Sequence, residues 1–325
     1  MKLLCVGIVL LGVSYFAGAD TFGTGENQFT IEFVTISGDS GNLGSWSAGW
    51  EYTFSGVNHG DYRIGKFEIT NDQWTKFINV HGKPDGSPSN AYDADPYWTG
   101  ANVPTNNVSW YEAAQFVNWL NIEAGKTAAY KFTGTPGTSN YTLGVWGASD
   151  AWGGTNLYRH KDAHYFLPTE DEWVKAAYWN GKTLQEYAIK SGESLHQGDG
   201  ISGTGWNYYD VGDSTDHPFA YGPWDVGSGS EELNGTFDMM GNVWEWMEGP
   251  FISDNYTSDG SHRIRGGSRY YYYPAETLGS SYRDYGDLAH DEHLYIGFRV
   301  ASVPEPASLG LLFLGGLLIR RMRFQ

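Results

Sequence analysis

The stretch Phe237-Asp238-Met239-Met240-Gly241-Asn242-Val243-Trp244-Glu245-Trp246 combines a glycine, two tryptophans and two carboxylates. On an extended backbone Trp244 and Trp246 point to the same side, because side chains alternate with a period of two. Gly241 permits a turn that a Cβ would obstruct. Asp238 and Glu245 place carboxylates on either side of that turn. The stretch is either a core strand with a tight entry turn or a point where functional groups converge.

The composition favours one large domain rich in loops. The chain has 325 residues, 44 glycines and 16% aromatic residues, which suits long loops held by large rings better than a helical bundle. The formal net charge is −18. Such a charge repels phosphate backbones and attracts divalent cations, so we expect no nucleic-acid partner.

The N-terminus predicts an exported protein. Lys2 precedes an apolar run from Leu3 to Val13, and Ala17-Gly18-Ala19 is typical of a cleavage site, so residues 1–19 read as a signal peptide. The single cysteine, Cys5, lies inside this segment. Cleavage would therefore leave a chain without disulfides, thiol nucleophiles or thiolate metal ligands.

The C-terminal residues 303–325 predict a sorting tail. Val303-Pro304-Glu305-Pro306 is followed by an apolar run to Ile319 and then by arginines. This order resembles the Pro-Glu-Pro sorting signals of certain Gram-negative bacteria, which implies a membrane sortase-like peptidase as partner and a place at the outer surface or in the matrix. The apolar run makes about 20 Å of helix, short of a hydrocarbon core of roughly 30 Å. A weak permanent anchor is the alternative.

Periodicity and capping predict the main elements between these ends. Residues 29–36 and 62–69 are β-branched and aromatic runs typical of strands. Three capping boxes, each followed by an apolar stripe, predict helices that start after Thr70, Ser109 and Thr169, the last two ending near Gly125 and Gly181. Residues 133–154 and 191–230 show no sustained period, and 264–265 and 296–300 predict two late strands.

Five motifs, in order along the chain, together resemble the formylglycine-generating enzyme family, the sulfatase-modifying factors. They are Val108-Ser109-Trp110, Phe166-Leu167-Pro168-Thr169-Glu170-Asp171-Glu172-Trp173, the stretch 238–246, Arg265-Gly266-Gly267-Ser268 and Gly297-Phe298-Arg299-Val300. The resemblance implies one α+β domain over residues 20–302, with a loop-rich, elaborated C-type-lectin-like fold of few short strands and about three capped helices.

The resemblance also implies structural calcium. The family's ligands fall on the side chains of Asp238 and Glu245 and on the carbonyls of Gly241 and Val243. A loop-rich acidic chain suits this hard cation, which takes six to eight oxygens. The alternative is that Asp238 and Glu245 pair with buried arginines such as Arg265 or Arg299.

A second calcium site of the family would begin at Asn207 and Tyr208. Its acidic partner would come from the loop that holds Asp213 and Asp216.

The chain departs from the family where catalysis takes place. The enzymes hold copper with two cysteines, and those positions correspond to Tyr271 and Glu276 here. Neither residue replaces a thiolate. We therefore expect no copper and no formylglycine-generating oxidase activity.

The tyrosine run Tyr270, Tyr271, Tyr272 and Tyr273, with Arg283 nearby, lies where the family keeps its peptide-binding cleft. Successive residues cannot all face one side of a strand, so some of these rings face water or a ligand. We expect a peptide or a glycan to bind there. The alternative is a packed strand with its hydroxyls in solvent.

His290-Asp291-Glu292-His293 is a local cluster with metal-ligand chemistry, in which the two histidines could share a helical face. The alternative is a solvated polar turn. The sequence thus predicts a calcium-stabilised binding protein. A metal-dependent enzyme that uses His290 and His293, or a purely structural surface protein, remains possible.

Overall fold

The computed structural model describes residues 18–41, 44–47, 51–57, 59–84, 95–136, 138, 140–209, 222–251, 256–257, 260–269, 275–283 and 286–304. The predicted sorting tail beyond Pro304 and most of the predicted signal peptide lie outside these residues. Among the described residues, no helix is both long and apolar enough to cross a membrane.

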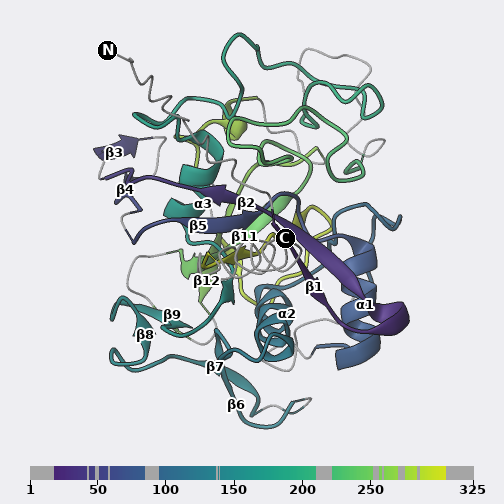
Figure 1. The fold of residues 1–325 in the computed structure, drawn as a ribbon, viewed down its shortest axis with the longest axis vertical. Helices are drawn as coiled ribbons and strands as arrows, with labels where there is room; N and C mark the ends of the chain where they lie inside the picture. Colours follow the sequence, from purple (N-terminus) through teal and green to yellow (C-terminus); the bar gives the residue numbers. More distant parts are fainter. Residues whose placement is uncertain are drawn as a thin grey trace, which may run out of the picture.

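A five-stranded antiparallel sheet joins the beginning and the end of the domain (Figure 1). Its order is β1 (Gly18–Phe22), β2 (Phe29–Ile36), β5 (Tyr62–Gly65), β15 (Ala301–Ser302) and β10 (Tyr165–Phe166). Along β2 the side chains of Phe29, Ile31 and Phe33 are buried and alternate with more exposed ones, as expected for a sheet with one face on the core.

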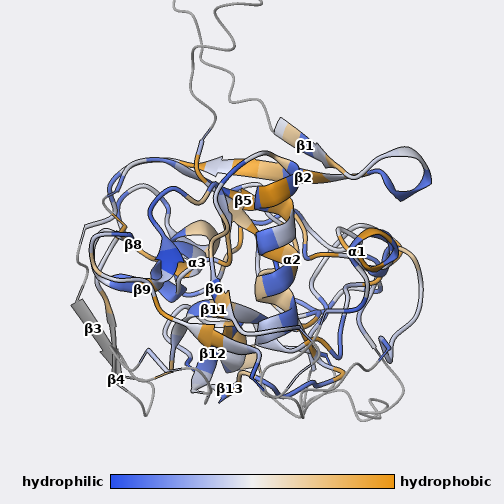
Figure 2. Ribbon diagram, turned by 90° about the horizontal axis from the view of Figure 1, so that it is seen from below, coloured by the Kyte–Doolittle hydropathy of each residue, from blue (hydrophilic) through white to orange (hydrophobic). Residues whose placement is uncertain are grey.

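Three α-helices follow the three predicted capping boxes. They are α1 (Asn71–His81), α2 (Trp110–Glu123) and α3 (Glu170–Tyr178). In each helix the N-cap side chain accepts a hydrogen bond from the N3 backbone N–H, and the N3 side chain accepts one from the N-cap backbone N–H. Figure 2 shows α2 running beneath β2 and β5. Its buried residues lie on nearly all sides, so α2 is the central helix of the core.

A four-stranded sheet contacts the start of α2 through β11 (Trp244–Pro250). Its order is β13 (Asp287–Leu288), β12 (Ser261–Arg265), β11 and β14 (Ile296–Gly297), with β11 and β14 parallel. Smaller elements are the pairs β3 (Gly44–Ser47) with β4 (Glu51–Phe54), β6 (Lys131–Thr133) with β7 (Thr142–Gly144) and β8 (Ala151–Trp152) with β9 (Asn156–His160), and the 3₁₀ turns η1 (Gly25–Asn27) and η2 (Ala275–Leu278).

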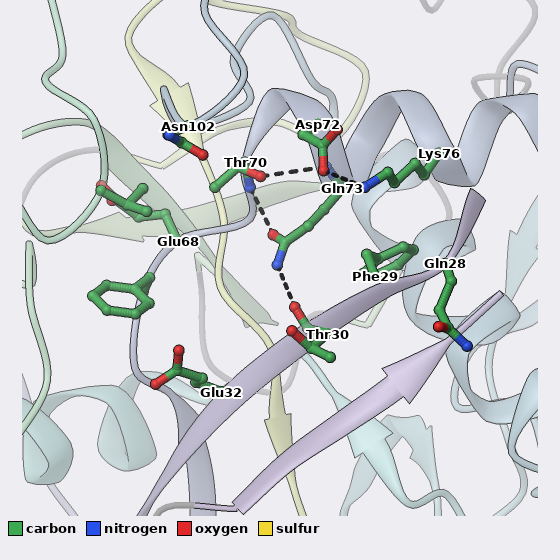
Figure 3. Close-up of a pocket in the computed structure, with 12 residues that line it drawn as sticks. Gln28, Phe29, Thr30, Glu32, Glu68, Thr70, Asp72, Gln73, Lys76 and Asn102 are labelled. Atoms are coloured by element: carbon green, nitrogen blue, oxygen red, sulfur yellow. Dashed lines mark hydrogen bonds and ion pairs between the residues drawn. The ribbon is translucent and has the colours of Figure 1, made fainter. Parts of the chain in front are cut away.

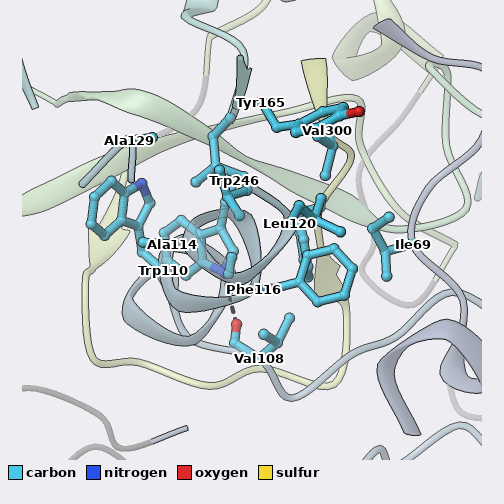
Figure 4. Packing of buried hydrophobic residues seen from close by; sticks show 14 of the residues in the cluster. Ile69, Val108, Trp110, Ala114, Phe116, Leu120, Ala129, Tyr165, Trp246 and Val300 are labelled. Carbon is cyan, nitrogen blue, oxygen red and sulfur yellow. Dashed lines mark hydrogen bonds between the residues drawn. The ribbon is translucent and has the colours of Figure 1, made fainter. Parts of the chain in front are cut away.

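Two indoles, one on β11 and one on α2, connect β11 to the start of α2. The Trp246 indole N–H donates to the Val108 carbonyl at 2.8 Å, and the Trp110 indole N–H donates to the Met247 carbonyl at 3.0 Å (Figure 4). All these rings are buried. Each indole therefore contributes a large apolar area and still satisfies its one donor.

The structure corrects the lengths of several predicted elements. The strand predicted over 62–69 ends at Gly65. The Lys66 N–H still donates to the Glu32 carbonyl of β2, but the Ile69 N–H donates to the Phe298 carbonyl, so the backbone changes partners beyond Gly65. Of the strand predicted over 296–300, only Ile296–Gly297 is a strand, which pairs with β11. The chain then crosses to β5, where the separate strand Ala301–Ser302 pairs. The third helix ends at Tyr178, and residues 133–154 contain short strand pairs.

Candidate functional site

The turn before β11 holds three residues in left-handed backbone conformations. Asp238, Gly241 and Asn242 have φ of 62°, 96° and 63°. A Cβ on Gly241 would lie 2.2 Å from the Asn207 carbonyl oxygen, so only glycine fits there. Two non-glycine residues at positive φ are unusual, and such strain is concentrated at functional sites.

Glu245 is fully buried and paired with an arginine. Arg299 donates to both of its carboxylate oxygens, at 2.7 and 2.6 Å, and the Trp173 indole N–H donates to Oε2 at 2.9 Å. The sequence left open whether Glu245 meets a calcium ion or a buried arginine, and this structure shows the arginine contact. Arg265, the other arginine considered, pairs with Glu170 instead.

Asp238 is buried beside this pair. Its Oδ2 accepts from the Gly227 N–H at 2.7 Å. Burial raises its pKa to about 6, although the Gly227 hydrogen bond and Arg299 oppose the change. Asp238 is therefore an acid without a direct cationic partner among the described residues.

Two further buried acids, Glu68 and Glu232, adjoin Asp238 and Glu245, and the sequence analysis did not identify them. We call these four acids the acid cluster. Burial, followed by the charges of Asp238 and Glu245, raises the pKa of Glu68 well above its usual value. Burial also raises the pKa of Glu232 to about 8. The only available signal for Glu68 was its place just before a capping box, which gives no indication of burial.

The acid cluster fits an additional cation in charge and in acceptors. Several buried carboxylates share the single guanidinium of Arg299, and Glu68 Oε1 has no hydrogen-bond partner among the described residues. Both Glu245 oxygens already accept hydrogen bonds, but a carboxylate oxygen can accept more than one. Calcium bound by Asp238, Gly241, Val243 and Glu245 would compensate this excess negative charge.

The second predicted set, Asn207 and Tyr208, fits calcium less well. The Tyr208 carbonyl already accepts from Gln197 at 2.8 Å and from the Arg269 guanidinium. Asn207 Oδ1 is buried without a partner among the described residues. The loop expected to supply the acidic ligand, residues 210–221, lies outside the described residues.

Of the predicted ligand-binding residues, Tyr270 to Tyr273 lie outside the described residues. Arg283 is described, and its guanidinium donates to Glu170 at 2.9 and 3.1 Å. Arg263 and Arg265 contact the same carboxylate. Arg283 thus belongs to a cluster of three guanidinium groups around one largely buried glutamate.

The predicted histidine cluster has a different membership in the structure. Asp287, Asp291 and His293 each place one ligand atom within 4.8 Å of the other two. His290 approaches Asp291, with 3.6 Å between Nε2 and Oδ1, but is not part of this group. The segment is a short strand and a turn, so the expectation of a shared helical face is wrong.

A polar pocket of about 410 Å³ lies between β2 and the start of α1 (Figure 3). Three of its charged side chains form ion pairs: Lys76 contacts Asp72 at 2.7 Å, and Glu32 lies 3.5 Å from Lys66. The described residues that line it include Glu68 but not Arg283 or the predicted calcium ligands. We find no feature that identifies an occupant.

Comparison with known proteins agrees with these motifs. A family profile described as "Sulfatase-modifying factor enzyme 1-like domain" matches residues 20–303. The chain is 25% identical over 269 residues to a protein of Paenibacillus barcinonensis named chaperone protein LppX, covering 76% of this chain and 84% of that protein. It is 24% identical over 257 residues to hercynine oxygenase of Mycobacterium tuberculosis, covering 74% of this chain and 52% of that enzyme. The chain thus spans about half the length of the oxygenase.

Solved structures share the fold. Treponema denticola variable protein 1 aligns with a TM-score of 0.57 at 20% identity, covering 88% of this chain and 99% of that one. PvdO from Pseudomonas aeruginosa aligns with a TM-score of 0.54 at 19% identity, covering 90% and 100%. The relationship to C-type lectins stays a prediction. Since the family profile covers almost all of the described residues, the chain belongs to the sulfatase-modifying factor enzyme 1-like domain family.

Proposed function

We propose that this chain is a binding protein of its family, without formylglycine-generating oxidase activity. The observation that carries the proposal is the position of the single cysteine, Cys5, outside the matched residues 20–303. The family resemblance places Tyr271 and Glu276 at the two copper-ligand positions. Without a thiolate pair the site lacks the soft ligands that copper needs in that chemistry.

The ligand in this proposal is a peptide or a glycan. Residues 270–273 and Arg283 remain the candidates for contacting it, on the resemblance to the family's peptide cleft. The relative named a chaperone supports the peptide, since a chaperone binds other polypeptides.

Calcium in this proposal stabilises the scaffold. Support comes from the buried carboxylates that share Arg299 and from Glu68 Oε1, which has no hydrogen-bond partner among the described residues. Export to the cell surface or matrix, with sortase-like processing of the tail, rests on the sequence features at both ends of the chain.

Two assays on the purified full-length chain test this function. A cysteine peptide from a sulfatase active site, incubated with copper and oxygen and followed by mass spectrometry, should remain unconverted. Peptide and glycan arrays should show saturable binding that weakens in Arg283→Met and is retained in Lys76→Met, which removes a cation elsewhere. Conversion of the cysteine, or silence on both arrays, would overturn the proposal.

A further inference from the structure

The edge strand β13 and the turn after it bring together three side chains with metal-ligand chemistry. Asp287 lies on β13, Asp291 in the turn and His293 at its end, and one ligand atom from each lies within 4.8 Å of the others. This group is separate from the Asp238–Glu245 stretch and uses a different set of atoms, two carboxylate oxygens and one imidazole nitrogen.

The spacing of these atoms is close to that of two ligands on one ion. The His293 Nε2 and Asp287 Oδ1 atoms are 3.7 Å apart, which is too long for a hydrogen bond. Two ligands that each lie about 2.1 Å from one tetrahedral ion are separated by roughly 3.4 Å. The three ligand atoms lie within 4.8 Å of one another, so a small inward movement of these partly exposed side chains would bring them to ligand spacing.

The two aspartates lack the arginine partners that several buried acids of this chain have. Glu170, Glu172 and Glu245 are paired with arginines. Within the part of the chain that the structure describes, Asp287 and Asp291 have only histidines as ion-pair partners. The group thus carries two negative charges with no permanent cation beside them.

The backbone holds the three residues in place. Asp287 pairs with His262 on β12, and the Asp291 N–H donates to the Leu288 carbonyl at 2.9 Å. The His293 carbonyl accepts from the Asn107 N–H at 3.1 Å, just before α2. The ligands are therefore presented by fixed elements, as a metal site requires.

The imidazole is oriented by an aromatic neighbour. The His293 ring stacks on Tyr295, with 5.0 Å between centroids and 11° between planes. About a third of the His293 side chain is exposed, so water can reach the open positions of a bound ion.

We propose that Asp287, Asp291 and His293 bind one divalent transition-metal ion of the zinc class, with water at the remaining positions. A mixed set of one nitrogen and two oxygens suits Zn²⁺. Ca²⁺ prefers six to eight oxygen ligands, which this group does not supply. The ion would connect β13 to the turn that leads into β14.

The test measures zinc on the untagged full-length chain by equilibrium dialysis with excess Ca²⁺ present, followed by elemental analysis. His293→Gln and Asp287→Asn should weaken zinc binding at least about tenfold, because even outer-sphere changes alter metal affinity by roughly 10–100-fold. Zinc should raise the melting temperature of the wild type and not that of His293→Gln. Circular dichroism checks that each variant is folded.

His160→Gln is the matched control. Its ring nitrogen lies 3.9 Å from Asp162, and this histidine–aspartate pair lacks a third ligand in the described residues. Its zinc binding should equal that of the wild type. Unchanged zinc binding in folded His293→Gln would overturn the proposal, as would displacement of zinc by equal calcium or equal losses in all variants.

Discussion

Replacing Arg299 by methionine should strongly destabilise the fold. Arg299 is fully buried and donates to both oxygens of Glu245. It also donates to the carbonyls of Gly65 and Phe237, each at 3.0 Å. Methionine preserves much of the apolar stem but leaves the Glu245 carboxylate buried without its cation.

The magnitude follows from the contacts. Removing one partner of a buried ion pair costs about 3–5 kcal/mol. The positive charge of Arg299 also lowers the pKa of Glu68, Asp238 and Glu232 against the effect of burial. Its loss therefore affects several acids at once, and we expect the upper part of that range.

Urea unfolding of Arg299→Met, Glu245→Gln and the double variant measures the effect as a double-mutant cycle. The double variant should be more stable than additivity predicts by roughly 2 kcal/mol, since neither charge is then left alone. Lys76→Met is the control, because its ion pair with Asp72 is partly exposed and should contribute less than about 1 kcal/mol. A cost below about 1 kcal/mol for Arg299→Met, or an additive double variant, would refute this account of the site.

Three further predictions concern calcium, protonation and capping. A calcium chelator should lower the melting temperature of the full-length chain. Asp238→Asn should lower the melting temperature in calcium and abolish the response to chelator, whereas Glu292→Ala should keep that response. A wild-type melting temperature that chelator does not change would show that calcium does not stabilise the scaffold. Burial lowers the pKa of His262 to about 3 in the folded chain. As pH falls from about 6.5 toward 3, His262 is protonated in the unfolded chain but not in the folded one, so the free energy of unfolding decreases by up to about 1.4 kcal/mol per pH unit. His262→Phe, which keeps a ring against Trp110, should be less pH-sensitive than the wild type over that window in urea titrations, and equal slopes would contradict the assignment. Ser109→Ala should cost about 1–2 kcal/mol in unfolding experiments, because its hydroxyl accepts from the Glu112 N–H and donates to the Glu112 carboxylate, and a neutral substitution would show that water replaces the cap.

Local signals were sufficient for the helix starts and for the strand over 29–36. Each capping box needs only residues three apart, so it can be read without knowing the fold. The strand over 29–36 follows from its own alternation. Strand ends depend on partners, and the chain from Gly65 to Ile69 changes its partners within a few residues.

The composition of the acid cluster could not be read from the sequence. Glu68, Glu232, Glu245 and Arg299 are far apart along the chain and meet only in the tertiary fold. The group proposed to bind zinc shows the same limit over a shorter stretch of sequence. The sequence suggested His290 and His293 as ligands, whereas in the structure Asp287 and Asp291 lie close to His293 and His290 is not part of the group. Side-chain direction in a turn depends on backbone angles that residue types alone do not set.

The sequence by itself determined the family, the three helix starts and the absence of cysteine from residues 20–303, because motifs, caps and composition are local properties. Only the tertiary structure decided which buried acid meets which arginine and which side chains with metal-ligand chemistry lie close together. Those choices depend on burial and on distances between segments remote in sequence, and Coulomb and desolvation energies follow that geometry.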